Sequence, residues 1–305
     1  MDKDQDAWAA QGAALVDPRG KHPSPPFARQ KQPWPGLACK MEPPPDHGEN
    51  SYRGSGRLMG RRALITGGDS GMGRAAAIAF AREGADVAIN YFPSEQEDAD
   101  SVLALIKEAG CRGFGIPGDL RSEEFCRNLV REAVKELGGL DILVNNAARQ
   151  QSHETMADIT SEEFDAVMKT NIYAPFWIMQ EALAHLKPGA TIIATTSEQA
   201  YDPSADLFDY AMTKAATMSY VKSLAKQLGP KGIRVNGVAP GPIWTPLQVS
   251  GGADMEKLEK FGSQTPLGRP GQPAELAGIY VQLADASASY ANGQVYGAAG
   301  GNGQP

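Results

Sequence analysis

Short apolar segments alternate with longer amphipathic segments from residue 57 onward. The short segments are continuously apolar, which predicts buried strands, and the longer ones have the periodicity of helices. We expect strands at 63–65, 86–90, 113–117, 141–144, 190–195, 232–238 and 294–297. We expect helices over 74–83, 95–109, 122–137, 161–186, 210–228 and 273–284. This alternation predicts an α/β protein with a doubly wound parallel sheet covered on both faces. Ligands of such sheets bind beyond the carboxyl ends of the strands.

The first part of the chain has a different composition. Nine of the 22 prolines lie before residue 46, and proline removes a backbone donor and fixes φ. We therefore predict an extended N-terminal arm over residues 1–52 and one catalytic domain over 53–305. The arm is either a solvated tail or a segment docked on its own or a neighbouring subunit through Phe27, Trp34 and Leu37.

Composition excludes several classes of protein. The net charge of -7 disfavours a nucleic-acid binder, which needs a basic face. The 3 cysteines and 4 histidines show no disulfide or metal-ligand spacing, so we expect no metal. There is no apolar run of the roughly 20 residues that a membrane helix needs. The chain starts with acidic residues where a signal peptide is basic, so we expect a cytoplasmic protein.

A glycine-rich turn follows the first strand. Gly67, Gly71 and Gly73 fall between that strand and a helix, and they allow a tight turn and a close approach of the backbone to a pyrophosphate. The turn predicts a cofactor loop that also contains Asp69, Ser70 and Met72. A plain strand–helix turn and a site for S-adenosylmethionine are the alternatives.

The next two strand ends bear on the choice of cofactor. A strict NAD site usually places an acidic residue where this chain has Asn90, which precedes Tyr91. Asn90 carries no charge to repel a 2′-phosphate, which tilts the prediction slightly toward NADP(H) over NAD(H). Asp119 and Leu120 follow the third strand and are placed to meet the adenine, although Asp119 could be a surface-turn residue.

Four polar residues form a candidate catalytic group. Tyr210 and Lys214 are four residues apart on a predicted helix and share one face. A nearby ammonium should lower the pKa of the phenol, which could then exchange a proton with a carbonyl or an alcohol. Ser197 follows the fifth strand and could orient the substrate oxygen. Asn171 lies in the middle of a predicted helix and could hold a water beside Lys214. Either of the last two, taken singly, could be structural.

Together these motifs resemble the short-chain dehydrogenases/reductases. The resemblance covers about residues 57–301 and rests on Thr66-Gly67-x3-Gly71-x-Gly73, Asn145-Asn146-Ala147-Ala148, Asn171, Ser197, Tyr210-x3-Lys214 and Pro240-Gly241. It implies a Rossmann-type fold, a nicotinamide cofactor and an active site of Asn171, Ser197, Tyr210 and Lys214. It also implies that Lys214 bonds the nicotinamide ribose. The further cofactor contacts that it implies are Asn146, Ala147, Pro240, Gly241, Ile243 and Thr245.

Two features qualify the resemblance. Many members have glycine at the position of Ala148, and a methyl group there implies modest repacking. The proline-rich arm, with residues 48–52, looks like that of a branch of general aldehyde or alcohol oxidoreductases linked to stress responses.

The resemblance also implies a homo-oligomer, commonly a tetramer that packs through helices 161–186 and 210–228.

Three segments should line the substrate pocket. They are residues 149–154, 198–202 and 243–261, and the last has the composition of a mobile lid. Trp244, Leu247, Met255 and Phe261 could close over an apolar substrate or pack the lid onto the sheet. We therefore predict an NAD(P)-dependent oxidoreductase for a small carbonyl/alcohol pair. The alternative is a non-catalytic regulatory protein that binds a dinucleotide.

Overall fold

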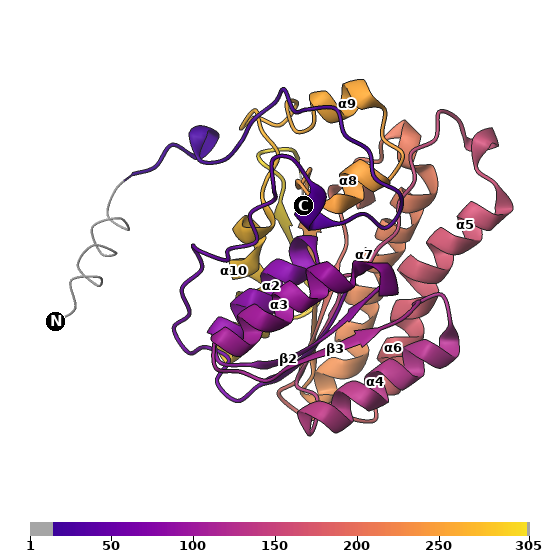
Figure 1. The fold of residues 1–305 in the computed structure, drawn as a ribbon. Helices are drawn as coiled ribbons and strands as arrows, with labels where there is room; N and C mark the ends of the chain where they lie inside the picture. The colour runs from indigo at the N-terminus through magenta and orange to yellow at the C-terminus, as the bar shows by residue number, and fades with distance from the viewer. Residues whose placement is uncertain (1–14, 304–305) are drawn as a thin grey trace.

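The computed structural model describes residues 15–303, which are built around one parallel sheet (Figure 1). The strand order is β3-β2-β1-β4-β5-β6-β7, so the order reverses beside β1. The strands are β1 (Arg62–Thr66), β2 (Asp86–Tyr91), β3 (Gly113–Pro117), β4 (Ile142–Asn145), β5 (Thr191–Thr195), β6 (Arg234–Pro240) and β7 (Val295–Ala298). This topology confirms the predicted doubly wound fold.

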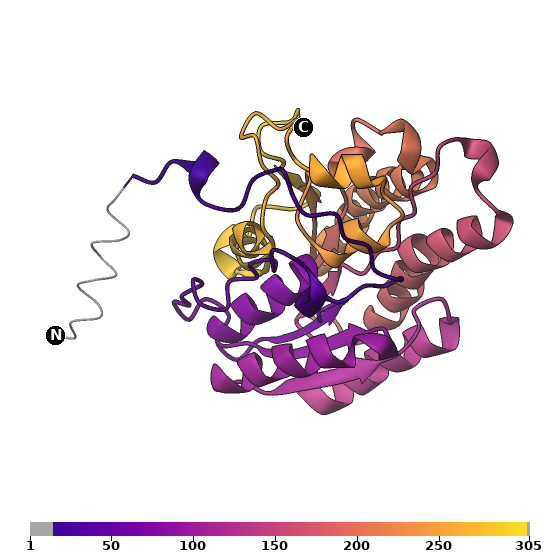
Figure 2. The same ribbon diagram turned by 45° about the horizontal axis from the view of Figure 1, so that its top comes forward.

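Helices cover both faces of the sheet (Figures 1 and 2). They are α2 (Gly71–Arg82), α3 (Gln96–Glu108), α4 (Glu123–Leu137), α5 (Ser161–Met168), α6 (Ala174–Ala182), α7 (Phe208–Leu228), α8 (Pro246–Ser250), α9 (Met255–Glu259) and α10 (Pro273–Ala284). Successive β1 side chains enter opposite cores. Ile65 packs in a cluster with α2, α3 and α10, and Leu64 packs in a cluster with α4, α6 and α7. Both faces of β1 are therefore buried, as its continuous apolar run predicted.

Two predicted segments differ from the structure. The single helix predicted over 161–186 is divided into α5 and α6 by a π-helical turn, Lys169–Tyr173. The predicted lid contains two short helices, α8 and α9, which the sequence pattern did not indicate. No helix within residues 15–303 has both the length and the apolar character needed to span a bilayer.

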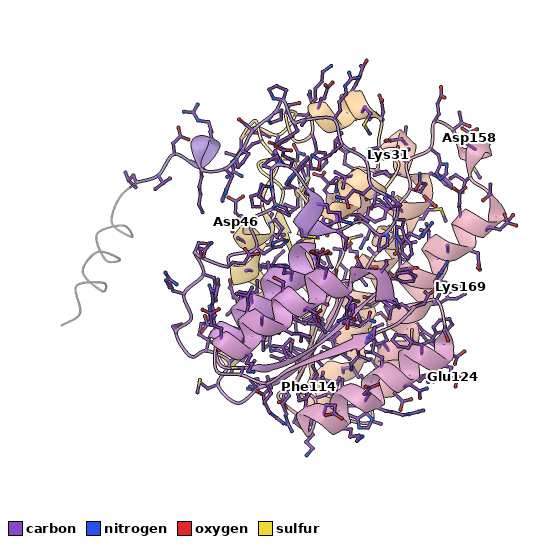
Figure 3. The ribbon with its side chains drawn as sticks, in the orientation of Figure 1. Lys31, Asp46, Phe114, Glu124, Asp158 and Lys169 are labelled. Atoms are coloured by element: carbon purple, nitrogen blue, oxygen red, sulfur yellow. The ribbon has the colours of Figure 1, made fainter. Side chains whose placement is uncertain are left out.

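The described part of the arm, residues 15–52, is docked on its own chain. The buried Phe27 ring stacks on Trp244 with centroids 4.3 Å apart, and Trp244 Nε1 donates to the Pro43 carbonyl oxygen at 2.8 Å. The arm passes α9 and α8 near Lys31 and reaches the start of α10 at Asp46, both labelled in Figure 3. The prediction of a solvated tail is wrong here, because apolar anchors and backbone hydrogen bonds hold the arm. Residues 1–14 lie outside the described part, and the domain boundary at residue 52 stays a prediction.

Candidate active site

An open cleft of ≈ 920 Å³ lies at the carboxyl ends of the strands. Such clefts hold the cofactor in doubly wound sheets. The glycine turn after β1, the ends of β2 and β3, the start of the β4–α5 loop and the catalytic helix α7 all contribute to its lining. Predicted residues that line it are Gly67, Asp69, Ser70, Gly71, Met72, Asn90, Tyr91, Asp119, Leu120, Asn146, Ala147, Tyr210, Lys214 and Thr245.

The glycine turn has the geometry of a phosphate cradle. A Cβ at Gly73 would lie 1.9 Å from the Gly67 carbonyl oxygen, so only glycine fits there. Gly71 begins α2 with φ +51°, which is a left-handed backbone conformation. The first turn of α2 holds no acidic residue, and the N-cap Ser70 makes no side-chain capping bond. The free amides of this turn fit the pyrophosphate of a dinucleotide.

Two carboxyl groups meet on the wall of the cleft. Asp69 of the glycine turn and Glu95 after β2 are both buried, and they lie close enough for each to change the pKa of the other. Burial raises the pKa of both groups, and the charge of Asp69 raises that of Glu95 further. Asp69 Oδ2 is buried without a hydrogen-bond partner. This unsatisfied oxygen fits a ribose hydroxyl. Sequence reasoning looked for such an acid at Asn90 and missed Glu95, which lies four residues beyond β2.

The predicted adenosine contacts have protein partners of their own. Asn90 is buried, and its amide donates to the Ile116 carbonyl oxygen at 3.1 Å, which ties β2 to β3. Asp119 lies at the cleft and forms an ion pair of 2.6 Å with Arg121. Both residues are where the sequence placed them, and Asn90 also has a structural role.

The structure brings the predicted catalytic residues together. Ser197 follows β5, and its hydroxyl lies close enough to the Tyr210 phenol to oppose the rise in the pKa of that phenol. Lys214 Nζ donates to the Thr195 carbonyl oxygen at 2.8 Å and lies 5.3 Å from the centre of the Tyr210 ring. All three side chains are buried. A hydroxyl pair and a buried amine therefore meet beside the glycine turn.

The predicted direction of the Tyr210 pKa shift is wrong. Burial raises the pKa of the Tyr210 phenol, and the hydrogen bond from Ser197 opposes this only in part. Burial lowers the pKa of Lys214 to about 7. Desolvation disfavours the charged form of each group. The phenol is therefore protonated at neutral pH, which suits a proton donor.

Asn171 lies in the π-helical turn between α5 and α6. Its Oδ1 accepts from the Arg149 N–H at 2.8 Å, and its Nδ2 donates to the Arg149 carbonyl oxygen at 2.9 Å and to Thr213 Oγ1 at 3.0 Å. The amide thus fixes the loop after β4 against the catalytic helix. The structure gives the side chain this positioning role, and the water beside Lys214 stays a prediction.

Some predicted contacts lie away from the cleft lining. Ile243 is buried in the core beside Leu276 and lines a second, smaller cavity. Gly241 packs against Ala299, and a Cβ there would lie 2.6 Å from the Ala299 Cα. Pro240 ends β6. Sequence reasoning instead missed several residues that do line the cleft, which are Trp34, Pro35, Phe92, Glu95, Thr170 and Pro246.

The first and third of the predicted substrate segments meet. The Ser152 N–H donates to the Gly251 carbonyl oxygen at 2.8 Å, and Lys257 Nζ forms an ion pair of 2.9 Å with Asp206. Leu247 lines the cleft. Trp244 is fully buried against the arm, so it packs the lid and does not close over a substrate.

Comparison with known proteins agrees with this geometry. The family model described as "Enoyl-(Acyl carrier protein) reductase" matches residues 67–302. The chain is 55% identical to the "Uncharacterized oxidoreductase YghA" of Escherichia coli, over 94% of this chain and 98% of that protein. It is 45% identical to "NADPH-dependent aldehyde reductase 1, chloroplastic" of Arabidopsis thaliana, over 90% of this chain and 97% of the relative.

One similar solved structure contains a bound nicotinamide dinucleotide. The short-chain dehydrogenase of Burkholderia cenocepacia in complex with NADP superposes with a TM-score of 0.75 and 36% identity, and the match covers 80% of this chain and 98% of that one. This chain therefore belongs to the short-chain dehydrogenase/reductase family. It is an oxidoreductase with a nicotinamide dinucleotide cofactor.

Proposed function

We propose that this oxidoreductase interconverts a small aldehyde or ketone and its alcohol, with Tyr210 as the general acid and base. The observation that carries the proposal is the position of Tyr210 and Lys214 together in the lining of the cofactor cleft, with the Ser197 hydroxyl near the phenol. When bound, the nicotinamide supplies hydride at C4 in reduction and accepts it in oxidation. The relative named as an aldehyde reductase supports the substrate class.

Each residue then has a separate task. Ser197 Oγ holds the substrate oxygen beside Tyr210, and the Tyr210 hydroxyl donates its proton to that oxygen during reduction. Lys214 holds the nicotinamide ribose and supplies positive charge near the phenol. The raised pKa of Tyr210 keeps the phenol protonated at neutral pH, so reduction is the favoured direction there. Oxidation needs the ionised phenol and therefore a higher pH.

The residues that would hold the cofactor follow from the cleft. The amides of the glycine turn would bind the pyrophosphate, and the ends of β2 and β3 would hold the adenosine half. We propose a preference for NADP(H), which the uncharged Asn90 and the relative named as NADPH-dependent support. The raised pKa values of Asp69 and Glu95 reduce the negative charge that a 2′-phosphate meets at neutral pH.

This carboxyl pair predicts a pH-dependent choice of cofactor. As the pH rises from 6 to 9 the pair loses protons, and its growing negative charge repels the 2′-phosphate. The ratio of the Kd for NADP to the Kd for NAD should rise about tenfold, the effect of one charge at short range. The double variant Asp69→Asn/Glu95→Gln keeps the shapes and should show a smaller change. Titrations with NADP and with NAD at pH 6 and at pH 9 measure the ratio. An equal change of the ratio with pH in the wild type and in the double variant would refute the role of the carboxyl pair.

The activity itself is tested by parallel titration and turnover. NADPH and NADH are titrated into the protein, and a panel of aldehydes, ketones and sugars is then added while the nicotinamide absorbance is followed. We expect binding of a dinucleotide and its consumption with at least one small carbonyl compound. Binding without consumption across the panel would instead indicate a non-catalytic dinucleotide-binding protein.

We also propose a homotetramer that packs through α5, α6 and α7. Exposed large apolar side chains lie on these helices, and such a surface marks an interaction site. Phe176 on α6 is 56% exposed and Met212 on α7 is 46% exposed. Phe176→Asp should reduce the solution mass to that of a dimer or monomer in light scattering. Tyr290→Asp, an exposed aromatic residue outside these helices, is the control. An unchanged mass for Phe176→Asp would place the interface elsewhere.

We propose a cytoplasmic location for the protein. All three cysteines, Cys39, Cys111 and Cys126, lie in the described part of the chain and carry free thiols, which suits a reducing compartment.

A further inference from the structure

The arm contacts α8 and then α3 where it passes the cofactor cleft. On one rim Ser250 of α8 donates from Oγ to the Pro35 carbonyl oxygen at 2.8 Å. On the other rim Asp98 of α3 accepts from the Ala38 N–H at 2.6 Å. Trp34 directly precedes the anchored Pro35, and both residues are part of the cleft lining. Neither residue belongs to the glycine turn or the strand ends that form the rest of the site.

Trp34 lies at the adenosine side of the cleft. Its ring meets Phe92 edge-on, with centroids 4.8 Å apart, and Phe92 directly follows β2. Trp34, Phe92 and Asp119 line the same cleft. The ends of β2 and β3 hold the adenosine half of a dinucleotide in doubly wound sheets. The indole and the Phe92 ring therefore form an aromatic wall where the adenine is expected.

Two guanidinium groups lie against the same indole. The guanidinium carbon of Arg149 is 4.4 Å and that of Arg121 is 5.9 Å from the ring centroid. Arg149 Nε is buried without a hydrogen-bond partner. Burial, and then the nearby charge of Arg121, lower the pKa of the Arg149 guanidinium. Two cations beside one ring make this wall attractive to an anionic cofactor, and only Arg121 has an ion-pair partner, Asp119.

We propose that Trp34 is a cofactor-binding residue and that the N-terminal arm completes the adenosine half of the dinucleotide site. The flat indole supplies a surface on which the adenine packs, and the anchors at Ser250 and Asp98 hold it over the cleft. This inference rests on the cofactor of the proposed function. The inference gives the proline-rich arm a role in cofactor binding. Prolines restrict the backbone of the arm, so holding Trp34 in place for the cofactor costs little conformational entropy.

The test measures the affinities of the full-length protein for NADPH, for NADH and for ADP, which contains only the adenosine half. Trp34→Ala should weaken binding of the preferred dinucleotide and of ADP by about tenfold, a typical loss for one base–aromatic contact. Trp34→Phe, which keeps an aromatic face, should stay within about threefold of wild type.

The control is Phe114→Ala on β3. Phe114 is a partly buried aromatic residue that contacts Arg112 and lies outside the cleft lining. It should cost stability without changing cofactor affinity. An unchanged affinity of Trp34→Ala for ADP would overturn the inference and leave the proposed function intact. Equal losses in Trp34→Ala and Phe114→Ala would also overturn it, since they would reflect general destabilisation. Failure of the wild type to bind either dinucleotide would overturn the proposed function as well.

Discussion

Tyr210→Phe is expected to lose about 10³-fold in kcat while its affinity for the cofactor stays within about twofold of wild type. The substitution removes only the phenol hydroxyl near Ser197, and it leaves the buried ring beside Lys214. The proton donor is lost and the cleft keeps its shape. Steady-state kinetics and a fluorescence titration of the cofactor measure the two quantities separately.

The matched control is Tyr220→Phe. Tyr220 lies on the same helix, α7, outside the cofactor cleft, so its hydroxyl should not affect turnover. A kcat for Tyr210→Phe within tenfold of that for Tyr220→Phe would show that another group transfers the proton.

Lys214→Met is expected to lower kcat about 10²-fold and to weaken cofactor binding about tenfold. Lys214 lies 5.3 Å from the Tyr210 ring and anchors to Thr195, so methionine removes both the charge near the phenol and the proposed bond to the ribose. Loss of both kcat and affinity separates this variant from Tyr210→Phe, which loses kcat alone. Lys222→Met, an exposed lysine on the same helix, should match the wild type in both measurements.

The same variant should change how stability depends on pH. Lys214 has a pKa of about 7 in the folded protein and 10.5 as its ordinary value. Between these values the folded chain binds fewer protons than the unfolded chain, so this residue makes the free energy of unfolding rise with pH. The slope is at most about 1.4 kcal/mol per pH unit. Urea denaturation at pH 7 and pH 9 should show wild type gaining stability relative to Lys214→Met. The absence of a relative gain would contradict the lowered pKa of Lys214 in the folded protein.

Most of the fold could be predicted because parallel strands buried on both faces are continuously apolar. Residues 63–65 show this directly, because they lie in β1 and all three are buried. Residues 113–117 also form a strand, β3, at the predicted bounds, although most of its residues are only partly buried. Tyr210, Lys214 and Ser197 could be predicted as neighbours because strand ends and helix starts meet at one edge of the sheet. Their spacing along the chain was sufficient information.

Other features depend on contacts that a local pattern does not contain. The π-helical turn at Asn171 changes the helical periodicity of the apolar residues only slightly, so the sequence pattern indicated one continuous helix. The docking of Phe27 on Trp244 joins segments far apart in the chain. Glu95 became part of the cleft because the turn after β2 folds back toward Asp69. The direction of the Tyr210 pKa shift required the burial of the phenol, which spacing alone does not give.

The most direct test of the central claim follows the hydrogen atoms. Reduced cofactor carrying deuterium at both hydrogen positions of the nicotinamide C4 is mixed with the protein and an aldehyde that it consumes, and the alcohol is analysed by mass spectrometry. The account predicts one deuterium on the carbinol carbon with wild type and almost none in the same time with Tyr210→Phe. An unlabelled alcohol, or equal labelling by both proteins, would contradict hydride transfer assisted by Tyr210.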